Sequence, residues 1–151
     1  VAPTPADLPM QAQDVIKRNV AWSVGAGILP LPWFDLAAVT GVQLKMISEL
    51  CGVYGIPFKQ SLARPIVVSL IGSLGAGVLA PALASTALKL IPGIGTLMSG
   101  TSLAATSAGI TYGVGHLFLD HFKRGGTLED FNLIGGRSLF KAKVDEAMSK
   151  I

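Results

Sequence analysis

Residues 65–88 read PIVVSLIGSLGAGVLAPALASTAL, and residues 96–119 read TLMSGTSLAATSAGITYGVGHLFL. Lys89 is the only formally charged residue from position 65 to position 119. As a helix, each stretch would extend about 36 Å, and the hydrocarbon core of a bilayer is about 30 Å thick. The connecting segment 90–95 holds one proline and two glycines, which favour a reversal of the chain. We therefore predict an all-α fold built on an integral membrane helical hairpin at 65–119.

The composition supports burial in an apolar environment. Half of the residues (50%) are hydrophobic and only 14% are charged, whereas a soluble domain is about 25% charged. Aromatic residues make up 7% and glycine occurs 18 times, which suits closely packed helices in lipid. The alternative is a water-soluble helical core, in which the other segments cover the two legs of the hairpin. The many Ser and Thr residues of the second leg, 96–119, keep that alternative open.

Small residues recur at helical spacing in both legs and predict faces where helices approach closely. They are Gly72, Ala76, Ala80 and Ala84 in the first leg, and Ala105, Gly109 and Gly113 in the second. Each face would pack either against the other leg or against another subunit. These faces predict a homo-oligomer.

Two helices are expected ahead of the hairpin, within residues 12–58. The first, 12–28, is followed by Pro30 and Pro32 and is short for a full crossing, so re-entrant, interfacial and spanning placements stay open. The second, 33–54, is amphipathic. Its apolar positions are Leu36, Val39, Leu44, Ile47, Leu50 and Val53. The sequence GIP at 55–57 predicts a break after it.

The segment after the hairpin predicts a separate tail at 127–151. Thr127, with acidic residues two and three positions later, is typical of a helix start. The Gly135–Gly136 pair would end that short helix, and 137–151 would form an amphipathic helix with Leu139, Phe140, Val144 and Met148 on one face. The chain thus divides into a flexible N-terminal segment (1–11), a membrane domain (12–126) and a C-terminal amphipathic helical tail (127–151).

Aromatic and basic residues flank the apolar segments. Trp22 and Trp33 are candidates for the membrane interface, where an indole is half apolar and half hydrogen-bonding, with ordinary hydrophobic contact as the alternative. The basic residues at the two ends of the hairpin are Lys59, Arg64, Lys123 and Arg124. Because cytoplasmic flanks carry an excess of Lys and Arg, we expect both termini in the cytoplasm.

No arrangement of residues predicts an enzyme. The P-loop pattern G-x-x-x-x-G-K-[ST] does not occur, and the legs have almost no ionisable groups for catalysis inside a membrane. His116 and Asp120 lie one helical turn apart, so we predict a polar contact, either between the two residues or as a pH-sensitive contact between subunits, since a metal would need a third or fourth ligand. Asp35 can cap the helix after it, and Cys51 is expected to be a core residue. We predict no cofactor and no metal.

Three short motifs occur in order ahead of the hairpin: ILPLPWFD at 28–35, VQLKMI at 42–47 and VYG at 53–55. With them, the chain resembles, over about residues 15–120, the bacterial family of uncharacterised membrane proteins known as domain of unknown function 697. The residues that carry the resemblance are Pro30, Pro32, Asp35, Gln43, Met46, Tyr54 and Gly55. The resemblance implies a protein of the bacterial cytoplasmic (inner) membrane that works with a GTPase partner, and it implies no catalytic residue.

We therefore predict a non-enzymatic integral membrane protein that acts as a membrane anchor or scaffold through homo-oligomeric assembly. Its expected partners are the lipid bilayer, copies of itself and a GTPase, and its net charge of +3 is too small to predict nucleic-acid binding. The alternative is an oligomeric pore lined by the Ser/Thr-rich second leg. Ion flux in reconstituted liposomes distinguishes the two.

Overall fold

The computed structural model describes residues 7–28, 36–74 and 94–149, and in this part of the chain the fold is all-helical. The helices are α1 (Leu8–Ile28), α2 (Leu36–Tyr54), α3 (Gln60–Gly72), α5 (Ile94–Lys123) and α6 (Leu133–Ser149). No strand occurs among these residues, so the prediction of an all-α protein is confirmed.

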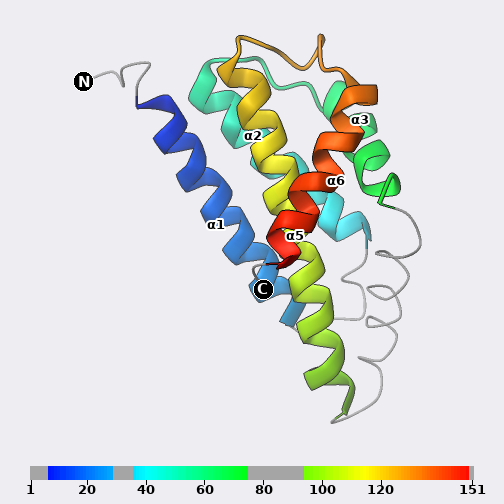
Figure 1. The fold of residues 1–151 in the computed structure, drawn as a ribbon. Coiled ribbons are helices and arrows are strands. Elements are labelled where there is room, and N and C mark those ends of the chain that lie inside the picture. Colours follow the sequence, from blue (N-terminus) through cyan, green and yellow to red (C-terminus); the bar gives the residue numbers. More distant parts are fainter. Residues whose placement is uncertain (1–6, 29–35, 75–93, 150–151) are drawn as a thin grey trace.

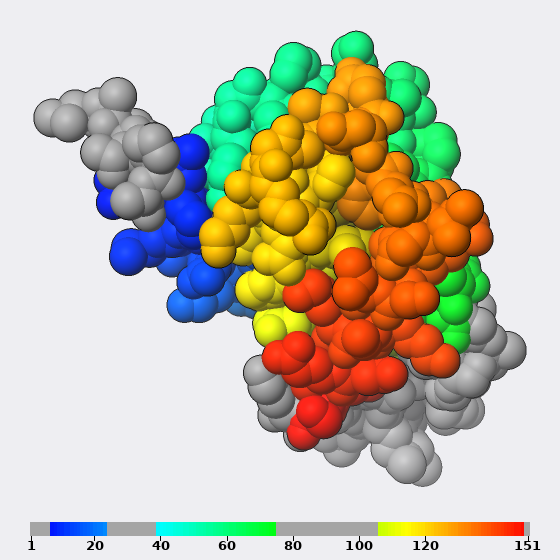
Figure 2. All heavy atoms as spheres, turned by 45° about the horizontal axis from the view of Figure 1, so that its top comes forward, coloured from blue at the N-terminus to red at the C-terminus, as the bar shows by residue number. Residues whose placement is uncertain are grey.

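The long helix α5 is the centre of the bundle. It contacts α1, α2, α3 and α6, most extensively α1 along one side and α6 along another. Figure 2 shows the second half of α5 and the whole of α6 forming one continuous surface. The second leg of the predicted hairpin is therefore a helix, but its described side chains from Thr106 onward lie mostly buried among helices of the same chain.

The core is built from the apolar faces of these helices. Phe118 of α5 and Phe140 of α6 are completely buried, as are Leu50 of α2 and Leu70 of α3. The ring of Phe118 stacks on that of Phe131 with centroids 4.7 Å apart. Truncating such a buried aromatic to alanine costs about 3–5 kcal/mol, so packing of α6 onto α5 is a substantial part of the fold's stability.

Glycines end two of the helices, and the first of these ends is the break predicted from the sequence GIP at 55–57. Gly55 after α2 has a φ of +67° and Gly125 after α5 a φ of +85°, a region that suits glycine because it has no Cβ. The Gly126 N–H donates to the His121 carbonyl at 2.9 Å, and the Gly125 N–H donates to the Phe122 carbonyl at 2.9 Å. This pair of bonds is a Schellman motif, which closes α5 and reverses the chain toward α6.

Helix α1 begins at Leu8, four residues before the predicted start at Ala12. Pro9 is compatible with this earlier start, because the amides of a first helical turn have no partner within the helix. Helix α2 begins at Leu36, and the predicted residues 33–35 lie outside the described part of the chain. Its predicted apolar face is buried at Val39, Leu44, Ile47 and Leu50.

The first leg is not a single helix beginning at Pro65. Helix α3 begins at Gln60, contains Pro65 and ends at Gly72, after which Ser73 and Leu74 form a turn. Pro65 is exposed, so the carbonyl that its missing N–H leaves unpaired can reach water. Residues 75–93, which include the remainder of this leg, are outside the described segments.

The tail also differs from its prediction. Residues 127–130 form a turn and not a helix, and the Gly135–Gly136 pair lies inside α6. The reason is the Asn132 side chain, which accepts a hydrogen bond from the Gly135 N–H at 3.2 Å and so starts α6 there. Phe140, Val144 and Ala147 then face the core, whereas Leu139 is 50% exposed.

Among the residues that the structure describes, none of the helices combines the length and the hydropathy that a membrane crossing requires. The transmembrane hairpin at 65–119 therefore stays a prediction.

Candidate functional site

A seam of polar side chains runs through the core where α1, α2 and α5 meet. The Gln43 amide (α2) donates to Thr111 Oγ1 (α5) at 2.9 Å, and the hydroxyls of Thr111 and Ser23 (α1) are 2.7 Å apart. Gln43 and Thr111 have no exposed surface. A bond between buried polar groups avoids the desolvation cost that each would have if unpaired, so this seam fixes how the three helices meet.

The seam has spare hydrogen-bonding capacity. Gln43 Oε1 and Ser107 Oγ are buried and have no hydrogen-bond partner among the described residues. Ser107 is one turn from Thr111 on α5, so both hydroxyls lie on the same side of that helix. Buried polar atoms without a partner are rare in native proteins, and an ordered water can complete such a site.

Charged residues lie at the outer side of the seam, between α1 and α2. The carboxylate of Glu49 accepts from Lys45 Nζ at 2.7 Å and from Arg18 Nη2 at 3.4 Å. The fully buried Asn19 side chain accepts from Lys45 Nζ at 3.2 Å and donates to the Val15 carbonyl at 2.9 Å. Two cations thus share one carboxylate, which leaves this group with a net charge of about +1.

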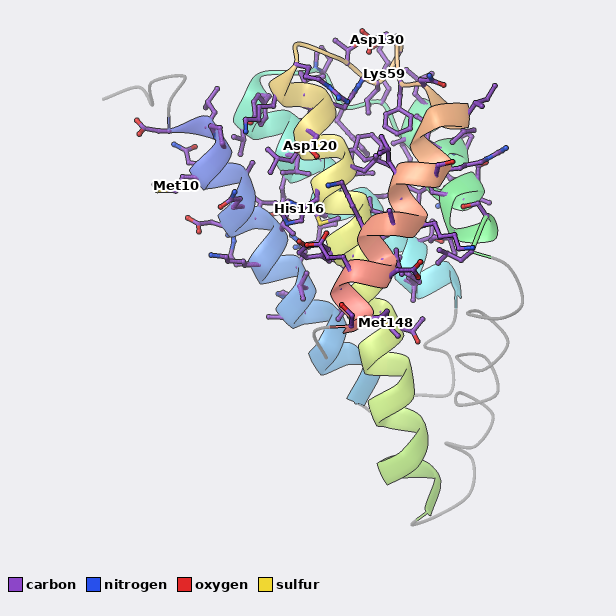
Figure 3. The ribbon with its side chains drawn as sticks, viewed as in Figure 1. Met10, Lys59, His116, Asp120, Asp130 and Met148 are labelled. Carbon is purple, nitrogen blue, oxygen red and sulfur yellow. The ribbon has the colours of Figure 1, made fainter. Side chains whose placement is uncertain are left out.

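Formal charges are segregated along the helices of the bundle. The end of α1 (residues 19–28), the start of α2 (36–44) and the first 18 residues of α5 (94–111) contain no Asp, Glu, Lys or Arg. The end of α1 and the start of α5 lie at the same end of the molecule (Figure 1). We call these three segments the uncharged pole. Lys59, Asp120 and Asp130 lie toward the opposite end (Figure 3).

The two described glycines of the predicted small-residue series in the second leg lie against α6. A Cβ at position 113 would stand 2.8 Å from Val144 Cγ2, and one at position 109 would stand 3.0 Å from Met148 Sδ. Gly115, which is not in the predicted series of small residues, lies against α1: a Cβ at this position would stand 2.7 Å from Ile16 Cγ1. In the first leg Gly72 has open space around it. Nothing is described for Ala76, Ala80 and Ala84, or for the side chain of Ala105.

The predicted interface residues have different surroundings. Trp22 is 66% exposed, with Lys45 Nζ 5.8 Å from its ring centroid. Lys59 pairs with Glu129 at 3.1 Å. Arg64, Lys123 and Arg124 are exposed, and Trp33 is not in the described segments. The structure therefore places the four described basic residues at or near helix ends, away from the uncharged pole.

Four of the motif residues are described, and all belong to α2 or to the turn after it. Gln43 is in the polar seam and Met46 is fully buried in the core. The Tyr54 ring lies 6.1 Å from that of Phe122, and Gly55 makes the positive-φ turn. These residues act through packing and helix termination. Pro30, Pro32 and Asp35 lie in a range for which no structure is described.

His116 and Asp120 each have a partner that the sequence did not predict. His116 packs against Tyr112 with ring centroids 4.3 Å apart, and Asp120 accepts from Lys143 of α6 at 3.1 Å. The adjacent His121 is a structural residue of the turn that follows α5. Its Nε2 is 2.7 Å from the Thr127 carbonyl and 2.9 Å from Asp130 Oδ1.

No group of His, Cys, Asp and Glu side chains suited to a metal occurs in the described residues. Cys51 is buried as predicted. Burial, together with the negative charge of Glu129, raises the pKa of its thiol to about 11, so the protonated form is favoured at neutral pH.

These features define an all-helical protein with a polar seam in its core and an uncharged pole at one end. The chain belongs to the family described as Domain of unknown function (DUF697), whose model matches residues 5–139. The predicted resemblance to this family is therefore confirmed.

A similar protein is Magnetosome membrane protein 22 of Magnetospirillum gryphiswaldense, which is 36% identical over 149 residues. The match covers 95% of this chain and 75% of that relative. No solved structure matches the chain.

Proposed function

We propose that this chain is a non-enzymatic membrane scaffold that inserts its uncharged pole into the bilayer and holds its charged half at the surface. The observation that carries the proposal is the segregation of charge along α1, α2 and α5. Placing one Lys, Arg or Asp at the centre of a bilayer costs about 2.5–3.5 kcal/mol, and this pole contains none of them. The membrane location named for the magnetosome relative supports the same conclusion.

The position of α6 favours insertion of the pole over two full crossings by residues 65–119. Helix α6 carries several charged residues and lies along α5 from Gly109 to Asp120. Its Glu146 is 3.4 Å from the hydroxyl of Tyr112. Lipid tails around this half of α5 would also surround those charges. The proposal therefore inserts the α5 part of the pole only from Ile94 to about Ala108, ahead of the contacts that Gly109 makes with α6.

The orientation follows from the basic residues of the charged half. Lys59, Lys123 and Arg124 all lie at ends of helices away from the pole. Since Lys and Arg favour the cytoplasmic side, the proposal places this half, with the start of α1, in the cytoplasm of a bacterium and the pole in its cytoplasmic membrane.

Homo-oligomeric assembly and a GTPase partner are part of the proposal. Ile134 is 83% exposed and Leu139 is 50% exposed, both on α6 in the charged half. Exposed aliphatic side chains of this size are frequent at protein contacts. Mass measurement of the detergent-solubilised particle tests assembly: a dimer or larger particle supports it, and a monomer contradicts it.

The described hydroxyls of the second leg support the scaffold over the pore. Thr106, Ser107 and Thr111 are buried between helices of one chain, whereas a pore would need them on a surface shared by several chains. Reconstituted vesicles are expected to show the same ion flux as protein-free vesicles.

Flotation with vesicles tests membrane insertion. The parent chain is expected to float with phosphatidylcholine vesicles in high salt, because insertion is apolar. The double variant Leu97→Lys/Leu103→Lys places two charges in the pole, and we expect it to reduce the floated fraction at least tenfold. The control Leu139→Lys adds charge to an exposed position of α6 and is expected to float like the parent. Equal flotation of all three chains would overturn the proposal.

A further inference from the structure

Helices α1 and α2 enclose a small open cavity at the edge of the uncharged pole. Its volume is about 300 Å³ and it is lined by Asn19, Trp22, Gly41, Val42 and Lys45. A Cβ built at Gly41 would meet nothing within 4 Å, so the absence of a side chain there keeps the space open. A volume of this size is at the lower end of those of small-ligand sites.

The cation in the cavity is held in place and retains binding capacity. Lys45 donates to Glu49 and to Asn19, and the ammonium has three N–H donors, so one is left for a ligand. Asn19 is itself fixed by its bond to the Val15 carbonyl. A pre-positioned ammonium binds an anion without first losing side-chain entropy.

The charges around the cavity favour an anion. The groups facing Lys45 are Glu49, which accepts from it, and Arg18, which pairs with the other oxygen of Glu49. Together with Lys45 itself, these groups carry a net charge of about +1, so the carboxylate does not cancel the attraction for a ligand with one negative charge. A phosphodiester has that charge and offers strong acceptor oxygens.

The aromatic wall indicates what is attached to the phosphate. Trp22 is 66% exposed, although it is one of the largest apolar side chains of the described part. It lies one turn beyond Arg18, the last charged residue of α1. An indole at a boundary between charged and uncharged segments is typical of the headgroup depth of a bilayer.

We propose that Lys45, Trp22 and the open space at Gly41 form a binding site for the phosphate of an anionic phospholipid headgroup. The site rests on the proposed insertion of the pole, which would place Trp22 at headgroup depth. Apolar insertion alone would bind neutral and anionic membranes equally well. The phosphate site would make the protein prefer anionic lipids.

The test measures the lipid preference through Trp22. Trp33→Phe leaves Trp22 as the sole tryptophan of the chain, which has two. Its emission is titrated with vesicles of phosphatidylcholine, with and without phosphatidylglycerol, and with inorganic phosphate. We expect binding about fivefold tighter with phosphatidylglycerol, as for one basic residue near an anionic surface.

Two variants of the site have matched controls. Lys45→Gln and Gly41→Leu are each expected to abolish the preference for phosphatidylglycerol while leaving binding to phosphatidylcholine. Lys59→Gln removes the same charge elsewhere, and Gly52→Leu enlarges another open position of α2, so both are expected to keep the preference. Circular dichroism verifies that each variant is folded.

The outcomes separate this inference from the proposed function. Failure of the parent to bind either vesicle would overturn the proposed function and the site with it. Equal binding to both vesicles, or a preference that survives both Lys45→Gln and Gly41→Leu, would overturn the site alone. A response of Trp22 to inorganic phosphate as strong as to phosphatidylglycerol vesicles, with the same dependence on Lys45, would assign the site to free phosphate and contradict the lipid.

Discussion

The side-chain amide of Gln43 donates to the Thr111 hydroxyl at 2.9 Å, with both residues fully buried. Gln43 lies on α2, and Thr111 belongs to the Ser/Thr-rich second leg. The bond therefore ties α2 to α5 in the middle of the core. It gives the Thr111 hydroxyl of a leg that lacks formal charge a polar partner from the same chain.

Replacement of Thr111 by valine tests this bond. The change keeps the shape but leaves the Gln43 amide and the Ser23 hydroxyl buried without their shared partner, which is expected to cost roughly 1–3 kcal/mol. Thr111→Ser keeps the hydroxyl and is expected to cost about 0.8 kcal/mol for the lost methyl group. Urea unfolding in detergent solution measures both, and equal stability of the two variants would contradict the role of the bond.

The close approach of α6 to α5 predicts a steric effect at Gly113. In Gly113→Ala the new Cβ would stand 2.8 Å from Val144 and 2.9 Å from Phe140, so overpacking of about 1–3 kcal/mol is expected. Gly52→Ala is the control, because nothing lies within 4 Å of its Cβ and alanine favours a helix by about 0.5–1 kcal/mol. Thermal unfolding should move in opposite directions for the two variants; a lower midpoint for both would argue against a steric cause.

The sequence predicted most helices because their signals are local. Gly55 and the Gly125–Gly126 pair mark helix ends, and the apolar positions of α2 are buried as their spacing indicates. The predicted helix end at Gly135–Gly136 is wrong because the Asn132 side chain, which accepts from the Gly135 N–H, starts α6 just ahead of the two glycines. The partners of His121 depend on the chain reversal at Gly125, which brings Thr127 and Asp130 back to it.

The surroundings of the second leg could not be predicted in the same way. A run without charges indicates burial, but lipid and the helices of the same protein are equally apolar neighbours. The placement of α6 on Gly109 and Gly113 depends on contacts between residues far apart in sequence. Its own pattern, with Phe140 and Val144 on one face, indicates only that it packs against something.

Deprotonation of Cys51 is expected to lower the free energy of unfolding in alkali. Its pKa is about 11 in the folded protein and about 8.5 in an unfolded chain. Below that lower value both states keep the proton. As the pH rises from there toward 11 the unfolded state loses it first, so the free energy of unfolding falls. Urea unfolding between pH 8 and pH 10 measures the slope, which should be smaller in Cys51→Ser; identical slopes would contradict the assignment.

Protonation of Asp130 is expected to destabilise its turn in acid. The Thr127 backbone amide, followed by His121, holds the pKa of its carboxyl below the usual range. The stabilising contribution of this carboxylate to the turn is therefore fully present above the unfolded value of about 3.9 and is lost as the pH falls through the lower folded value. The Thr127 amide resonance should titrate with a midpoint below 3.9, and Asp130→Asn should remove the transition. A midpoint at or above the unfolded value would refute the bond.

Insertion of the uncharged pole is tested most directly by its accessibility in vesicles. In a Cys51→Ser background, nitroxide labels are placed singly at positions 96–104 of α5 and at Ser138, an exposed residue of α6. We predict that the labels in α5 collide with oxygen, which concentrates in lipid, far more often than with a water-soluble nickel complex. The label at Ser138 should show the reverse. If all labels at 96–104 collide more often with the nickel complex, as the label at Ser138 is expected to do, the pole stays in water and the proposed insertion is contradicted.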